Sequence, residues 1–158
     1  MVREAATRLY DVDRNAVIVK KLTETGNYDT GTIAIRAKAG KLIDLDQLHE
    51  SIWATRLSGG TKSGLVSMEV TAVGESAMQG NELVFKVSGS DAHFVLRKHT
   101  DAKRQGAFDE LRSALDRGDK VVTVGGQLEG WTGRWPDVLR SLPAKPRRIL
   151  VTEFETSK

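Results

Sequence analysis

The chain has 158 residues and a mass of 17.3 kDa, which suits one ordinary domain or two small units sharing a core. Hydrophobic residues make up 39% and charged residues 28%, a balance typical of a folded protein rather than a disordered one. The net charge of +3 is smaller than expected for a protein that coats a polyanion. The absence of cysteine excludes disulfides, thiolate zinc sites, iron–sulfur clusters and cysteine nucleophiles.

The sequence shows no sign of membrane insertion or of a signal peptide. No apolar run approaches the roughly 20 residues that a membrane helix needs, and the charged start MVREAATRLYDVD is unlike a signal sequence. We therefore expect a soluble protein. Its compartment stays open, because a cytoplasmic protein and the mature form of an exported one can both lack cysteine.

Two strands and one helix are predicted in the first third of the chain. Residues 16–22 are rich in β-branched side chains and residues 31–38 alternate, so both segments predict strands. The sequence ETGNYDTG between them is typical of a turn. Asp44 with Gln47 three residues later indicates a helix start, and this helix should end near Leu57, before a Ser-Gly-Gly sequence.

The rest of the chain predicts five strands and one helix. The strands are expected at residues 65–73, 82–87, 93–99, 120–130 and 147–154, and the helix at residues 107–117. Gly74 and residues 79–81 predict turns, and Gly118 predicts the end of the helix. The adjacent Gly125 and Gly126 indicate a bulge or bend within the fourth of these strands.

Three strands, a helix and two further strands follow one another over residues 65–155, which is the order of the OB-fold. This part of the chain resembles that family. The resemblance implies a five-stranded Greek-key barrel, with the helix between the third and fourth strands closing one end. The expected fold class is α+β, mainly antiparallel β, with an OB-like barrel at residues 64–158 after a smaller half at residues 1–63.

The N-terminal half carries a second resemblance. The sequence GTIAIRAKAGKLIDLDQLHESIWATRL, followed by LVSMEVTAVGE, reads as strand, helix and strand over residues 31–75. It is similar to the latter half of a heavy-metal-associated, ferredoxin-like domain, which implies a small ferredoxin-like unit. That unit either stands alone or shares strand 65–73 with the barrel. The family binds metal through a CxxC loop, and without cysteine the metal-carrier function does not transfer.

No catalytic motif is found, so we expect a protein that is not an enzyme and binds neither cofactor nor metal. Gly60 and Lys62 lack the spacing of a phosphate-binding P-loop, and the nucleophile motif GxSxG is absent. The three histidines, His49, His93 and His99, have no metal-binding spacing. Carboxylates at the predicted helix starts are explained by capping.

The segment of residues 131–148, which leads into the last predicted strand, combines aromatic and basic side chains. In OB-folds this loop and the face of strands two and three contact oligonucleotides or oligosaccharides. Aromatic rings stack on bases there, and guanidinium groups bind phosphates. The candidate ligand-binding residues are Trp131, Arg134, Trp135, Arg140, Lys145, Arg147, Arg148, Lys98 and Phe85.

Three functions are compatible with the sequence as a whole. The first is a non-enzymatic binding or interaction module with a protein partner, because residues 131–148 can equally pack over the barrel or contact another protein. The second is a single-stranded nucleic-acid-binding OB-fold protein. The third is a metal-handling accessory built on the heavy-metal-associated scaffold. The sequence leaves the ligand and the oligomeric state open.

Overall fold

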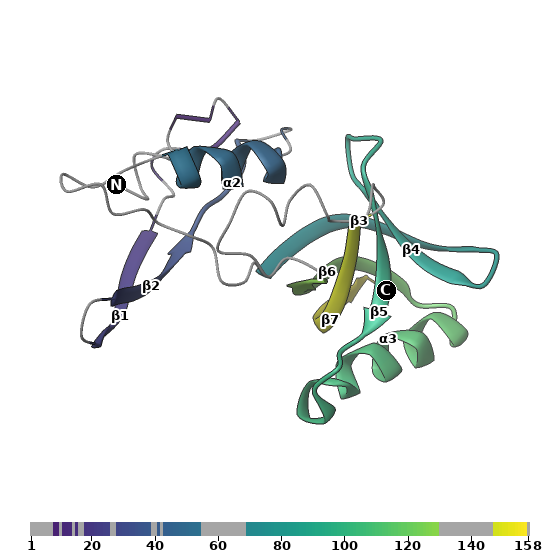
Figure 1. Cartoon of the computed structure of the whole chain (residues 1–158). Coiled ribbons are helices and arrows are strands. Elements are labelled where there is room, and N and C mark those ends of the chain that lie inside the picture. The colour runs from purple at the N-terminus through teal and green to yellow at the C-terminus, as the bar shows by residue number, and fades with distance from the viewer. Residues whose placement is uncertain are drawn as a thin grey trace. The chain divides into compact units, whose positions relative to one another are not determined.

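A computed structural model of the chain describes residues 8–9, 11–13, 15, 18–25, 28–38, 41, 43–54, 69–129 and 147–157. The described residues divide into two compact units, one within residues 8–54 and the other formed by residues 69–129 and 147–157 (Figure 1). Strands predominate in both units, as the composition of the predicted elements suggested. Among the residues described, no helix is long and apolar enough to cross a membrane.

The N-terminal unit contains a two-stranded sheet and one helix. Strands β1 (Ile18–Thr25) and β2 (Tyr28–Ala34) pair in antiparallel fashion, with a register shift between Lys21 and Thr23. Helix α2 (Leu45–Ala54) follows. The Oδ1 atom of Asp44 accepts a hydrogen bond from the backbone N–H of Gln47 at 3.1 Å, which confirms the predicted helix start.

The strands of this unit extend further than expected into the sequence ETGNYDTG. Residues 24–25 and 28–31 belong to β1 and β2, because Thr and Tyr favour strands. The chain reverses within this sequence as predicted, since Thr25 pairs with Tyr28 in the antiparallel ladder. The described part of the strand expected at residues 65–73 belongs to the closed sheet of the C-terminal unit, and among the described residues no third strand pairs with β1 and β2. A ferredoxin-like arrangement of residues 31–75 stays a prediction. The predicted helix end at Leu57 lies outside the described residues.

The C-terminal unit is built on five strands whose sheet closes on itself. The order around the ring is β3 (Glu69–Gln79), β4 (Glu82–Val87), β5 (His93–Lys98), β7 (Arg147–Ser157) and β6 (Lys120–Leu128). Strands β5 and β7 run parallel, and every other neighbouring pair is antiparallel. The prediction of a mainly antiparallel strand-rich fold is thus confirmed.

Strand β3 is longer than predicted and changes partner in its middle. The first part pairs with β6 as far as Val73, and the part from Gly74 onward pairs with β4. The expected turn at Gly74 is therefore wrong. A Cβ atom at Gly74 would clash with the carbonyl oxygen of Lys86, so glycine allows the two strands to approach closely where the sheet bends. The turn predicted at residues 79–81 is confirmed between β3 and β4.

Apolar side chains from all five strands fill the inside of the ring. Partners in the strand ladders share one face of the sheet, so the register identifies the inward residues. The buried members of this set are Ala72, Leu83, Phe85, Val87, Phe94, Leu96, Val124, Leu128, Ile149 and Val151. The outward positions of β3 are exposed, as expected for a sheet with one face in a core.

A helical segment connects β5 to β6 and covers one end of the ring (Figure 1). It consists of the short 3₁₀ helix η2 (Ala102–Arg104) and of α3 (Gly106–Asp116). Leu111 of α3 is fully buried. The helix ends before Gly118, whose φ of 88° favours glycine, and this confirms the predicted end.

The pairing of β6 with β7 shifts register between Gly125 and Gly126, which confirms the predicted bulge. Strand β7 also extends three residues beyond the predicted Phe154, to Ser157. This extension pairs with the first residues of β6. The bulge therefore lets one long strand follow the curvature of the ring.

Candidate functional site

The ladder between β4 and β5 is unusually short. Only Val84–Lys86 of β4 pair with His93–Val95 of β5. In the same register Leu83 would face Leu96, but no pairing is formed there. Among the described residues, residues 82–83 of β4 and 96–98 of β5 therefore have a strand neighbour on one side only, β3 and β7 respectively. We call this separation the split.

A pocket of about 480 Å³ lies at the split, and all five residues of the two unpaired edges line it. We call it the β4–β5 pocket. Its remaining lining comes from the β3–β4 turn, α3 and the ends of β6 and β7. The full lining is Met78, Asn81, Glu82, Leu83, Leu96, Arg97, Lys98, Thr100, Phe108, Arg112, Glu129, Arg148 and Leu150. This volume falls within the roughly 300–1,000 Å³ of ordinary ligand sites.

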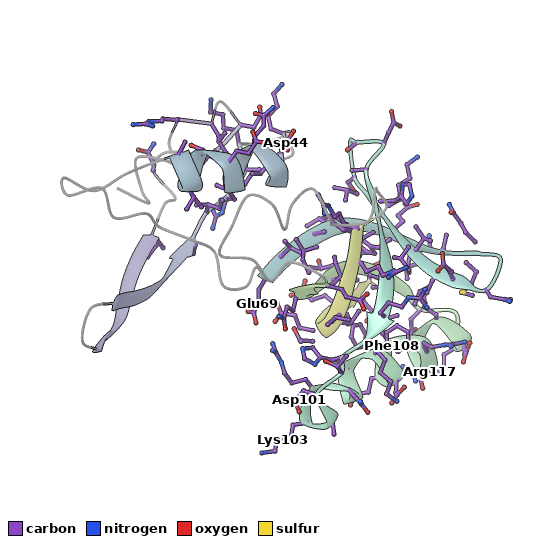
Figure 2. The ribbon with its side chains drawn as sticks, in the orientation of Figure 1. Asp44, Glu69, Asp101, Lys103, Phe108 and Arg117 are labelled. Atoms are coloured by element: carbon purple, nitrogen blue, oxygen red, sulfur yellow. The ribbon has the colours of Figure 1, made fainter. Side chains whose placement is uncertain are left out.

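The pocket combines a buried apolar floor with partly exposed apolar side chains. Leu83, Leu96 and Leu150 are buried. Phe108 is half-buried, and Figure 2 shows it on the side of α3 that faces the closed sheet. Met78, near the tip of the β3–β4 hairpin, keeps 57% of its surface exposed. The pocket therefore offers apolar surface that a bound molecule would remove from water.

Ion pairs hold the charged side chains around the pocket in place. Arg97 pairs with Glu82 at 2.5 Å and so spans the split from β5 to β4. Arg148 pairs with Glu129 at 3.6 Å, across the ends of β7 and β6. These pairs are exposed, so their main effect is to orient two guanidinium groups rather than to stabilise the fold.

Basic groups outnumber acidic ones at the pocket. The lining contains four basic side chains and two acidic ones, and Arg112 of α3 has no ion-pair partner among the described residues. Lys98 is paired outside the lining, with Asp109 of α3 at 2.6 Å. The surplus favours a ligand that carries negative charge.

The end of β5 is attached firmly to its surroundings. His99 is 95% buried, and its Nδ1 atom accepts a hydrogen bond from the backbone N–H of Asp101 at 2.9 Å. Its Nε2 atom lies 3.3 Å from the side-chain oxygen of Gln127, to which it donates since Nδ1 is an acceptor. Arg104 of η2 pairs with Glu69 of β3 at 3.0 Å. These contacts fix the start of α3, and hence Phe108 and Arg112, relative to the sheet.

The structure brings together two of the nine predicted ligand-binding residues. Lys98 and Arg148 both line the β4–β5 pocket. Arg147 is half-buried and lies opposite Phe94 in the parallel ladder of β7 and β5, away from the pocket. The predicted residues that lie outside the described residues are Trp131, Arg134, Trp135, Arg140 and Lys145.

Phe85 does not lie on a surface. Its side chain is fully buried, because its position on β4 points into the ring together with Leu83 and Val87. The sequence predicted the strand that contains Phe85 correctly. The alternation of β4 was taken to put the phenyl group of Phe85 on an accessible face of the sheet, but that face is the inside of the ring. In the structure Phe85 is a core residue, and the aromatic side chain that reaches the pocket is Phe108.

Several pocket residues were not among the predicted site residues. Met78, Glu82, Arg97, Phe108 and Arg112 come from four elements, β3, β4, β5 and α3, and only the packing of those elements brings them to one place. One signal was available, since Phe108 and Arg112 are four residues apart on a predicted helix and therefore share a face.

No group of three metal-binding side chains is found among the residues that the structure describes. His93 is exposed on β5, whereas both ring nitrogens of buried His99 are engaged in the contacts described above. The side chain of His49 is not described.

Comparisons with known proteins give no relative from which a function could be transferred. No family model matches the chain, and neither a curated protein nor a solved structure shows significant similarity to it. Functional inference therefore depends on the geometry of the β4–β5 pocket.

Proposed function

We propose that this chain is a non-enzymatic binding module that holds a segment of a partner protein in the β4–β5 pocket. The proposal includes an OB-like assignment of the C-terminal unit. Five strands in a closed sheet, with a helix between the third and the fourth in chain order, support that assignment. Fold alone does not determine function, so the pocket carries the argument.

The observation that carries the proposal is the composition of the pocket. Buried leucines form its floor, while exposed Met78 and half-buried Phe108 stand beside oriented arginines. Apolar surface surrounded by polar and charged groups, with arginine and aromatic side chains present, is typical of protein interfaces.

The acidic groups of the pocket argue for binding rather than catalysis. Glu82 and Glu129 are each paired with an arginine, Glu82 through Oε1 and Glu129 through Oε2, so the two carboxylates have similar surroundings. A general acid–base pair needs carboxyl groups whose environments differ. Their role in the proposal is to position Arg97 and Arg148.

A single-stranded nucleic acid is the alternative ligand, and the surplus of basic groups at the pocket favours it. The sheet itself favours a protein. The outward positions of β4 and β5 are Glu82, Val84, Lys86, His93, Val95 and Arg97, with no Phe, Tyr or Trp for base stacking. Phe85 and Phe94 of the same strands are buried inside the ring.

The proposal predicts that peptides selected against the whole chain depend on Met78. A display library of random peptides about 12 residues long supplies the probes. Met78→Thr should weaken the selected peptides about tenfold, because the exposed thioether would become buried on binding. Affinities are measured by fluorescence polarisation, with Val73→Thr as the matched control, since Val73 is 60% exposed on the same strand but does not line the pocket.

The outcomes separate the two ligands. Failure to select any peptide that Met78→Thr weakens and Val73→Thr does not would overturn the proposal. A fluorescent oligo-dT should not bind at low salt. Binding that falls with salt by a power of about 0.7 for each phosphate contact would instead support the nucleic-acid alternative.

A further inference from the structure

Within the part of the chain that the structure describes, the two strand edges at the split are unpaired and line the same pocket. Residues 82–83 of β4 pair with β3 on their other side, and residues 96–98 of β5 pair with β7 on theirs. All five residues line the β4–β5 pocket. An unpaired strand edge is a ready template for a further strand, and extended peptides are recognised in this way by many proteins.

We propose that the β4–β5 pocket binds an extended, acidic and apolar segment of a partner protein as an inserted strand between β4 and β5. This inference rests on the proposed function and specifies how the partner is held. The inserted strand completes the ring where its own ladder stops, and its backbone pairs with both edges. A segment of about three residues matches the length of the unpaired edges at about 3.3 Å per residue.

The side chains around the split suit such a guest. In a strand, alternate side chains point to opposite faces of the sheet. On the inner face, a guest residue meets Leu83, Leu96 and the half-buried Phe108, so an apolar side chain is favoured. On the outer face it meets Arg97 and Arg148, which already hold carboxylates of this chain.

Charge complementarity indicates an acidic residue in the guest. Among the described residues Arg112 has no ion-pair partner, and the guanidinium groups of Arg97 and Arg148 retain donors beyond those used by Glu82 and Glu129. Guanidinium groups prefer carboxylates because two parallel hydrogen bonds can form. The ion pair between Arg97 and Glu82 spans the split, and both side chains are long enough to remain in place beside an inserted strand.

Insertion is tested by methylating backbone nitrogens one at a time in a peptide obtained from the display library. An inserted strand has a protein edge on both sides, so each of about three consecutive N–H groups should be required. Methylation at each of these positions should weaken binding about tenfold or more. Methylation at the peptide ends is the matched control and should have little effect.

The pattern of losses decides the question. If methylation weakens binding only at alternate positions, the peptide pairs with one strand edge only. If methylation weakens binding at no position, only the side chains of the peptide are recognised. Either result overturns insertion but leaves the protein-binding function in place. If no selected peptide binds more weakly to Met78→Thr, the proposed protein-binding function is itself overturned. Amide hydrogen exchange of the whole chain provides a second measurement. Binding should protect at least one amide within residues 82–83 and one within residues 96–98.

The proposed need for an acidic residue in the bound peptide is tested separately with the same selected peptide. Replacing the acidic residue of the selected peptide by its amide should weaken binding to the unmodified chain about fivefold or more. The same replacement should have a smaller effect on the Arg112→Gln variant, since one cationic partner is already lost. An equal effect in both chains would remove Arg112 from the site.

Discussion

Phe85→Ala should lower the free energy of unfolding by about 3–5 kcal/mol. The side chain of Phe85 is fully buried inside the ring, next to Phe94 in the ladder of β4 and β5. Truncation to alanine removes the favourable transfer free energy of the phenyl group. It also leaves a cavity that the surrounding side chains can fill only in part. Since small domains are stable by about 5–15 kcal/mol, urea denaturation followed by tryptophan fluorescence or circular dichroism will measure the loss easily.

Phe108→Ala is the matched comparison, because the same truncation is made at a phenylalanine whose side chain is half-buried and lines the pocket. It should cost less stability than Phe85→Ala and should weaken the display-selected peptides. Phe85→Leu, which keeps most of the volume, should remain folded and bind those peptides as the unmodified chain does. Weak binding by Phe85→Leu with unchanged stability would return Phe85 to the ligand-binding residues.

The local features of the fold were largely predictable from the sequence. Alternation of apolar and polar residues located β4 and β5 to within one residue, and the capping residue Asp44 located the start of α2. Glycine also marked the end of α3 at Gly118. These signals are local, because each depends on neighbours within about one helical turn or one strand.

Glycine was a poorer guide within the strands. Gly74 was expected to end a strand, yet it lies in the middle of β3 and permits the close approach of β4. The same residue type serves both purposes, and which one applies depends on a strand that is distant in sequence. The mixed character of the ring has the same origin, since the parallel pairing of β5 and β7 joins segments separated by 48 residues or more.

The candidate site was predictable only in part. Lys98 and Arg148 were chosen for their charge and do line the pocket. The split was not predictable, because it arises where the ladder between β4 and β5 stops short of the ends of both strands. Both strands have a regular alternation of apolar and polar residues, so neither sequence indicates where their pairing ends. Met78 and Phe108 line a pocket only because the β4–β5 ladder ends before the strands do.

Gly126→Ala should lower the free energy of unfolding by about 2–3 kcal/mol. A Cβ atom at this position would clash with the carbonyl oxygen of Leu150 and would lie 2.9 Å from the Cγ2 atom of Ile149. The obstacle is backbone of β7, which is fixed by β5 on one side and by β6 on the other. Relief therefore requires a shift of the ladder at the bulge, and the change is measured by urea denaturation.

Two further glycines provide controls for this substitution. A Cβ at Gly125 would meet the side chain of Glu153, which can move, so Gly125→Ala should cost less. A Cβ at Gly106 meets nothing within 4 Å, and in the first turn of α3 alanine should stabilise the protein by about 0.5–1 kcal/mol. The three variants should therefore rank Gly106→Ala, Gly125→Ala and Gly126→Ala in order of decreasing stability. An effect of Gly126→Ala within about 0.5 kcal/mol would contradict the register of β6 and β7, because the close approach at the bulge depends on it.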